Sequence, residues 1–503
     1  MSANFVSMDA YAPGYLSSFG PEAQNQLQSL NKALMTTGLN GVGTPGDGSP
    51  VRVQSLEQML RNITFTMSDL RLWPKIQKVP AYNVVEEYNI LRAYGGRSGL
   101  FAGEGALQPA NDSLYERMFA TIKFMVEVRE ISHPSILIQS AVGDIVTRYA
   151  TDATMNILGK LENALFFADS SLSQFSFDGI KKQVELWGDD TQILDKRGQG
   201  LTPDDIEISA NILRSHFGRV QKSKMYMAPG VLADFTRNWI PFQRTFSGDW
   251  KGQTGNPFSA WQSQFGDVEF QDDVFLVPPN NGKLPTNPLV QPGGVPATPG
   301  TPIVAAAVST LPTGAVNTSV TTSEFDSVTP GGTFYYFYSA NNSYGESMAS
   351  AASNAVTVAN GQFVSLTISR ILTQPLASFY KIYRGTQANG SDAQYMTSVK
   401  DPGGSSSTFV FVDANQDIPG TGSVFLLDMS PGVLEFKQLG PMMKLDLAPI
   451  NLMYRFALVL YGTPVLTQPT KAVILKNVGA SALNALGVPS TSMLNVLGPM
   501  YAG

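Results

Sequence analysis

Apolar and polar residues alternate along residues 118–131, where an apolar side chain occupies every second position from Met118 to Val128. Charged and hydroxyl side chains fill most of the positions between them. A period of two predicts a β-strand, here about twice the usual length of roughly 5 to 6 residues. The face that carries the apolar side chains consists of Met118, Ala120, Ile122, Phe124, Val126 and Val128.

The segment before this strand, residues 95–113, is rich in glycine and small polar residues. This composition is typical of the tip of a long hairpin. A hairpin of that length is expected to project from its domain. Because an isolated two-stranded ribbon is only marginally stable in water, we expect it to lie on a second molecule.

A helical period replaces the alternation in residues 141–169, which contain no proline. The spacing predicts one long α-helix, about 40 Å at 1.5 Å per residue. Its apolar positions are Val142, Val146, Tyr149, Ala153, Ile157, Leu161 and Leu165. A helix is predicted at 203–217, a strand followed by a helix in 224–239, and a strand at 268–277. This order indicates an α+β fold.

The first 60 residues carry weaker signals. Apolar residues at helical spacing in 21–34 are followed by the turn-rich stretch 38–50, which is typical of an arm rather than a domain. Further helical pieces are predicted at 56–61 and at 65–73, the second ended by Pro74.

Proline and glycine dominate residues 278–302, so we expect an extended linker that packs no core. Short β segments separated by turn residues follow it up to residue 425, and they predict a β-sandwich of about 120 residues. The clearest segments are 334–340, 363–371, 379–383 and 408–412. Strand character returns at 433–437, 444–447, 456–461 and 472–475. The sandwich is therefore predicted to be inserted into a domain that resumes after it.

The amino-acid composition of the chain excludes several classes of function. Of the 503 residues, 15% are charged, against roughly 25% in an average soluble domain, which suggests that much of the surface meets other protein. A net charge of -6 argues against a chain that neutralises phosphates. The absence of cysteine excludes disulfides, thiolate nucleophiles and iron-sulfur sites, and two histidines nearly exclude a multi-histidine metal site. Without a signal peptide or a membrane span, we expect a soluble protein of a reducing compartment.

Several motifs have a structural interpretation that we prefer. Gly41, Gly43 and Gly46 match the dinucleotide fingerprint but lack the strand before and the helix after them, so we interpret them as part of a linker. Acidic pairs at 189–190, 204–205 and 272–273 could support hydrolysis by two carboxylates, but neighbours in sequence usually point apart. Thr202, Pro203, Asp204 and Asp205 predict a helix start, whereas the other two pairs are interpreted as turn residues.

The remaining candidates are histidines and aromatic residues. His216 is predicted to cap a helix C-terminus, and His133 precedes a proline; neither has an evident serine or aspartate partner. The aromatic run of residues 334–338 could stack sugars or bases, but in a sandwich alternate positions would fill the core. The sequence thus predicts no catalytic, cofactor-binding or metal-binding residues, no cofactor and no enzyme activity.

The ordered set of segments resembles the major capsid proteins of tailed bacteriophages with the Hong Kong 97 fold. The likeness rests on VQSLE at 53–57, LRNITF at 60–65, AYNVVEEYN at 81–89, YER at 115–117, REISHP at 129–134, ENALFFADSS at 162–171, FDG at 177–179 and MAP at 227–229. The insertion resembles immunoglobulin or fibronectin type III modules through GTFYY at 332–336, NNSYGES at 341–347 and FYKIYR at 379–384.

The resemblance implies names for the parts. Residues 1–79 would be the N-terminal arm, 80–132 the E-loop, and 133–280 the first part of the peripheral and axial domains, with the long helix as spine. Residues 281–302 would be the linker, 303–425 the immunoglobulin-like sandwich on the outer surface, and 426–503 the returning strands and tail. A long charged scaffolding segment is missing at the N-terminus, which implies a separate scaffold protein or none.

The predicted function is that of a structural capsid protein. The subunits would self-assemble as hexamers and pentamers into an icosahedral shell around double-stranded DNA, bound without sequence specificity. A portal and scaffold or decoration proteins are the further partners, no membrane is involved, and the chain would pass from the host cytoplasm into the virion. Two alternatives stay open: an encapsulin-like compartment shell, and a polysaccharide-acting enzyme with a β-sandwich module.

Overall fold

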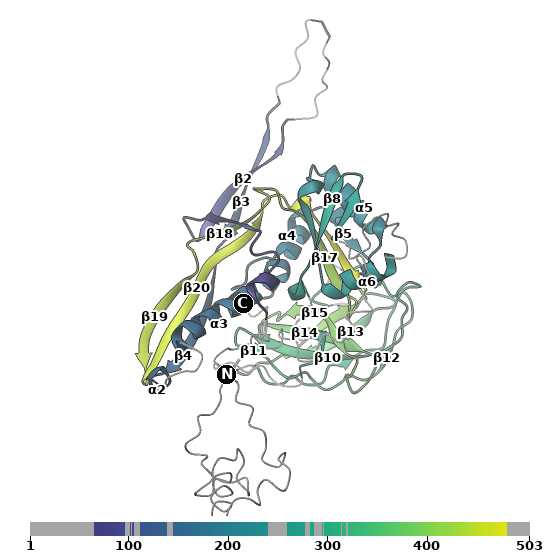
Figure 1. Ribbon diagram of the computed structural model, residues 1–503. Coiled ribbons are helices and arrows are strands. Elements are labelled where there is room, and N and C mark those ends of the chain that lie inside the picture. Colours follow the sequence, from purple (N-terminus) through teal and green to yellow (C-terminus); the bar gives the residue numbers. More distant parts are fainter. Residues whose placement is uncertain are drawn as a thin grey trace, which may run out of the picture. The chain divides into compact units, whose positions relative to one another are not determined.

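The computed structural model describes residues 65–95, 101, 103–104, 111–137, 144–239, 259–276, 282–285, 294, 296–312, 314–317 and 320–479. The predictions made for residues 1–60 lie outside the described residues, as does most of the hairpin tip at 95–113. The predicted α+β class is confirmed, since helices and strands alternate in mixed order along the described chain (Figure 1).

The long strand β20 (Met453–Leu466) organises a five-stranded sheet. Its first part lies between β4 and β19, and its last residues pair with β18, which pairs in turn with β1. The partner strands are β1 (Gln77–Pro80), β4 (Lys123–Ser132), β18 (Leu434–Gln438) and β19 (Met443–Ile450). This sheet joins strands from both sides of the insertion, so the two parts of the chain fold together.

The predicted long helix is α3 (Ile145–Phe167). It begins at Ile145 because the side chain of Asp144 accepts the backbone N–H of Thr147 at 2.9 Å. Ala153 and Ile157 of α3 pack against Phe456 and Leu458, so the helix lies on one face of the β20 sheet (Figure 1). The rest of its apolar stripe enters the main hydrophobic core.

A second, six-stranded sheet follows the order β5-β21-β17-β6-β8-β7. Its strands are β5 (Ile193–Asp195), β6 (Ser223–Met227), β7 (Ala260–Ser263), β8 (Gly266–Asp272), β17 (Gly422–Asp428) and β21 (Ala472–Val478). The main core takes residues from this sheet and from helices α4 (Ile180–Trp187), α5 (Pro203–Ser215) and α6 (Pro229–Trp239). Because β17 begins at Gly422, the insertion ends before the predicted boundary at 425.

The insertion consists of two antiparallel sheets, β11-β10-β14-β15 with β12 on β10, and β16-β13-β9. Tyr336 and Ile382 of the first sheet and Leu366 and Phe411 of the second share one buried core, as expected of a sandwich. The strands are β9 (Ile303–Val304), β10 (Thr333–Asn342), β11 (Gly345–Glu346), β12 (Val356–Thr357), β13 (Val364–Ser369), β14 (Phe379–Gly385), β15 (Gln394–Lys400) and β16 (Thr408–Asp413).

Short helical turns complete the described chain. They are α2 (His133–Leu137) and the 3₁₀ turns η4 (Met67–Asp69), η5 (Asp190–Gln192), η6 (Val220–Lys222), η8 (Val274–Leu276) and η10 (Pro469–Lys471). Two predictions are wrong here. Residues 65–73 hold only the η4 turn instead of a helix, and the strand predicted at 268–277 ends at Asp272, where the η8 turn replaces its last part.

The strand predicted at 118–131 is two strands. β3 (Leu114–Thr121) pairs with β2 (Val85–Ala93) in a hairpin, and β4 pairs with β20. Ile122 separates them: its side chain is buried and its backbone N–H donates to the carbonyl oxygen of Val84 at 2.8 Å. The alternation of apolar and polar residues continues through the break because each of the two strands has two different faces, β3 in the hairpin and β4 in the β20 sheet.

The linker prediction is also partly wrong. Leu284, which lies inside residues 281–302, packs with Phe337 and Tyr383 on the outer side of the first sandwich sheet. This part of the linker therefore contributes to a small core, although proline and glycine surround it in the sequence.

Candidate assembly surfaces

The β2–β3 hairpin has no third strand among the described residues. Large apolar side chains stand on its surface: Tyr115 is 70% and Phe119 74% exposed. Charges alternate with them, and Arg117 Nη1 lies 3.2 Å from Glu87 Oε2 across the strands. Because a two-stranded ribbon buries little of its own surface, this hairpin is a candidate contact surface.

A second candidate surface is one face of the β4-β20-β19 sheet, here called the outer apolar face. Phe124 and Val126 of β4 are 58% and 52% exposed, although they belong to the apolar positions of the predicted strand. Directly opposite on β20 lie Tyr461 and Val459, and the rings of Phe124 and Tyr461 meet edge to face at 5.1 Å. The remaining members are Val128, Ala457, Met443 and Leu445.

The polar side of β4 faces the interior instead. Glu127 accepts a hydrogen bond from Asn156 of α3 at 2.8 Å and lies 3.8 Å from the Lys160 ammonium group. Burial lowers the pKa of Lys160, and the charge of Glu127 acts against this shift. Glu127 of β4 thus binds the spine helix, whereas Phe124 and Val126 are left on the surface.

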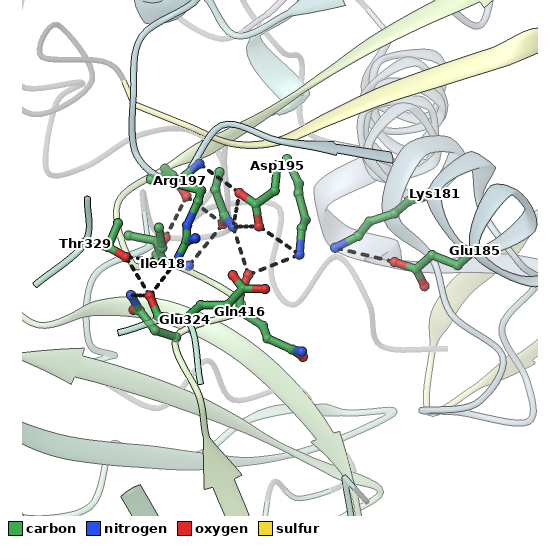
Figure 2. A network of polar contacts seen from close by, with 12 residues as sticks. Lys181, Glu185, Asp195, Arg197, Glu324, Thr329, Gln416 and Ile418 are labelled. Carbon is green, nitrogen blue, oxygen red and sulfur yellow. Dashed lines mark hydrogen bonds and ion pairs between the residues drawn. The ribbon is translucent and has the colours of Figure 1, made fainter. Parts of the chain in front are cut away.

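The sandwich is joined to the second sheet by a polar network (Figure 2). Arg197, which follows β5, donates from Nη2 to the carbonyl oxygen of Glu324 at 2.6 Å and lies 3.0 Å from Asp326. Thr329 Oγ1 donates to the same carbonyl oxygen at 2.8 Å. Arg197 has a φ of 52°, a left-handed conformation that costs free energy in a residue with a side chain, so the surrounding contacts must hold it.

Asn477 at the end of β21 forms the second half of this joint. Its Nδ2 donates to Asp195 Oδ1 at 2.9 Å and to the carbonyl oxygen of Gln416 at 2.8 Å, and its Oδ1 accepts the N–H of Ile418 at 3.0 Å. Lys476 lies 3.0 Å from Asp195. The network therefore holds an internal loop of the insertion, at residues 324–329, and the chain that leaves the insertion at residues 416–418.

The histidines differ from the sequence interpretation in one respect. His216 caps α5 as predicted, with Nδ1 2.9 Å from the carbonyl oxygen of Ile212. It does have an acidic partner, since its Nε2 lies 3.0 Å from Asp189 Oδ2, so the prediction that it lacks one is wrong. Asp189 lies in the turn after α4, 27 residues before His216, so the spacing of residues in the sequence does not reveal the contact. The contact ties the ends of two helices.

The acidic pairs are explained by structure. Asp205 accepts the backbone N–H of Thr202 at 2.8 Å, which confirms the predicted helix start. Asp272 and Asp273 point apart as expected: Asp272 binds the Arg71 side chain at 3.0 Å, and Asp273 is fully buried. Asp273 stands at the start of the η8 turn, as the interpretation of a turn residue requires, and its side chain accepts the backbone N–H of Phe275.

The aromatic run of residues 334–338 fills cores on both faces of β10, with Tyr336 and Tyr338 inside the sandwich and Phe337 under the linker. Among the described residues, no group of three or more His, Cys, Asp or Glu side chains is arranged to hold a metal ion. None of the described helices is both long and apolar enough to cross a membrane.

The comparisons with known proteins come from sequence and from structure. No family model matches the chain. Over 443 residues it is 27% identical to the major capsid protein of Staphylococcus phage S25-3, covering 86% of this chain and 91% of the relative. The major capsid protein of Staphylococcus phage K is 26% identical over 442 residues, with the same coverage. These relatives confirm the resemblance to phage major capsid proteins.

Solved structures with a similar trace include the capsid of cyanophage A-1(L), at a TM-score of 0.45 and 9% identity, covering 86% of this chain and 98% of that one. The SrpI encapsulin of Synechococcus elongatus PCC 7942 aligns at a TM-score of 0.37 and 9% identity, covering 88% and 98%.

Proposed function

We propose that this chain, a homologue of phage major capsid proteins, is the subunit from which a Hong Kong 97-type icosahedral shell is built. Its role is structural. The observation that carries the proposal is that two apolar surfaces, the β2–β3 hairpin and the outer apolar face, stay uncovered among the described residues while the core beneath them is complete.

The two surfaces fit a shell because each requires a neighbour. Exposed aromatic and aliphatic groups in a contiguous patch mark protein contact sites, and the hairpin cannot bury its own side chains. If each subunit lays its hairpin on the next one, many modest contacts add up around a closed ring. Assembly then supplies the stability that the isolated hairpin lacks.

The proposal also covers the partners of the chain and the location of its assembly. We expect hexamers and pentamers of this chain, a portal at one vertex and double-stranded DNA inside, with assembly in the host cytoplasm. A net charge of -6 suits a wall that does not hold the genome tightly. The sandwich is proposed to be an immunoglobulin-like module on the outer surface, and no catalytic turnover is expected of the chain.

The test is assembly of the full chain expressed alone, followed by electron microscopy and sedimentation. Closed shells of uniform diameter are expected from the wild-type chain, and Val126→Asp should yield folded subunits without shells, because it places a charge on the outer apolar face. Leu372→Asp is the matched control, since this sandwich residue is 51% exposed; it should assemble normally. Shells from Val126→Asp, or loss of shells in the control, would contradict the assignment of surfaces.

A further inference from the structure

A buried carboxylate on the spine helix holds the segment that precedes β1. Glu162 of α3 is fully buried, and its two oxygens accept backbone N–H groups from three consecutive residues, Arg71 at 2.7 Å, Leu72, and Trp73 at 2.9 Å. We call residues 70–76 the strap. Three N–H donors on one carboxylate are a strong, charge-assisted arrangement, and they explain why the strap is not helical.

A second buried carboxyl group, that of Asp273, interacts directly with Glu162. Asp273 follows β8, and its Oδ1 accepts the backbone N–H of Phe275 at 2.8 Å. Its Oδ2 is buried and has no donor. Burial raises the pKa of Glu162, partly offset by its backbone donors, and burial together with the charge of Glu162 raises the pKa of Asp273 well above its usual value.

The charged and titratable groups around the pair form their hydrogen bonds and ion pairs with other partners, although burial lowers the pKa of Lys78 and the charge of Glu162 acts against this shift. Arg71 of the strap reaches Asp272, Lys78 Nζ donates to the carbonyl oxygen of Trp73 at 2.6 Å, and Lys75 reaches Gln271. From the sheet, Lys224 binds Glu269 at 2.6 Å, and burial and nearby carboxylates raise the pKa of Tyr226, whose hydroxyl is buried. None of these described contacts brings a cation to Asp273 Oδ2.

Two adjacent carboxylates without a cation are unfavourable in a desolvated site, whereas one proton between them removes a charge and gives the orphaned oxygen its hydrogen bond. We propose that Glu162 and Asp273 share a single proton at neutral pH and that this proton locks the strap to the spine helix. The lock connects the strap with α3, the longest of the described helices, so the protonation state of the pair affects how firmly the strap is held.

The direction of the pH effect follows from the raised pKa values. A carboxyl group whose pKa is higher in the folded than in the unfolded chain contributes stability that is fully present below the unfolded pKa. This contribution is lost as pH rises through the folded pKa. The strap should therefore be tightest in acid and loosen progressively as the pH rises toward the folded pKa values of the pair.

Hydrogen exchange of the Arg71, Leu72 and Trp73 amides in the full chain, corrected for the intrinsic pH dependence of exchange, tests the lock. Between about pH 6 and about pH 9 their protection should fall roughly tenfold or more in the wild type. In Asp273→Asn the amide group replaces the shared proton as a donor to Glu162, so protection should stay nearly constant. Asp267→Asn, an exposed residue of β8, is the matched control and should follow the wild type. Equal pH profiles in Asp273→Asn and wild type would overturn the proposal.

Infrared spectroscopy provides a readout that does not depend on a variant's folding. At neutral pH the native chain should show the carbonyl stretch of a protonated carboxylic acid, since exposed aspartate and glutamate side chains are ionised there. The band should disappear in alkaline solution over the same pH range in which the strap amides lose protection. A native chain with no such band at neutral pH would rule out the shared proton.

Discussion

The β2–β3 hairpin and the inserted sandwich are both made of antiparallel strands rich in aromatic residues, yet they bury those residues very differently. Tyr336 and Tyr380 of the sandwich are fully buried, whereas Tyr115 and Phe119 of the hairpin are mostly exposed. The sandwich has two sheets that cover each other, and the hairpin has one. Strand chemistry alone therefore does not decide whether a β element is stable by itself; the number of layers does.

The polar groups show the same contrast. In the sandwich, Lys381 and Glu346 form a buried pair at 2.9 Å, and Arg384 lies 2.7 Å from Asp413 in the interior. The hairpin pair of Arg117 and Glu87 is open to solvent on both sides. Buried ion pairs require a fixed geometry, so the sandwich is a preformed unit. The exposed pair of the hairpin imposes no such geometry, and we expect the hairpin to become ordered only when it contacts a neighbouring molecule.

The strongest test of this contrast removes the hairpin. Replacing residues 88–118 with a two-residue Asn-Gly turn joins positions that face each other across the ribbon, since Glu87 pairs with Phe119. We expect a folded subunit whose melting temperature is nearly unchanged, because the removed strands contribute little to the described cores, and complete loss of closed shells. Sedimentation and electron microscopy measure the second effect, and calorimetry the first. Normal shells would mean that the hairpin is not an assembly element.

A smaller effect is expected from breaking the sandwich interior. Asp413 accepts hydrogen bonds from Arg384 at 2.7 Å and from the Tyr336 hydroxyl at 2.8 Å. Asp413→Ala leaves the buried Arg384 guanidinium with its hydrogen bond to Asn415 but without its carboxylate partner, which should cost about 3 to 5 kcal/mol. Hydrogen exchange of β10 and β14 measures this loss, and exchange of β20 should stay unchanged. Lys400→Ala, at an exposed position of β15, is the control; a loss below about 1 kcal/mol in Asp413→Ala would contradict a preformed sandwich.

The elements with one repeating pattern could be predicted from the sequence, because a single face is buried in each. Helix α3 and strand β13 are of this kind, whereas β10 and β14 are buried on both faces and were indicated by their β-forming residues between turns. The prediction of one strand at residues 118–131 was wrong because the alternation of apolar and polar residues runs through two strands with different surroundings. In β3 it belongs to a ribbon, and in β4 the apolar side is the exposed one while Glu127 binds the spine helix. A pattern reveals that two faces differ, but it does not tell which face the rest of the chain covers.

The candidate surfaces and contacts were predictable to different degrees. Glycine-rich residues 95–113 between two strand patterns indicated a projecting hairpin that needs a neighbour. The joint of Arg197 and Asn477, and the pairing of Glu162 with Asp273, bring together residues that lie more than 100 positions apart. Only the fold creates such contacts, because no local pattern in the sequence links residues so far apart.

The smallest expected effect is the difference in coupling free energy between an exposed ion pair of the hairpin and a buried ion pair of the sandwich. Replacing Arg117 and Glu87 singly and together gives the coupling free energy of an exposed pair, which should be below about 0.5 kcal/mol and vanish in about 1 M salt. The same cycle on Lys381 and Glu346, side chains only 2% and 5% exposed, should give a coupling several times larger that salt hardly changes. Hydrogen exchange of unassembled subunits measures both cycles. A salt-resistant coupling above about 1 kcal/mol in the hairpin would show that the ribbon is already fixed before it meets a neighbour, and the distinction between a preformed sandwich and an unfinished hairpin would fail.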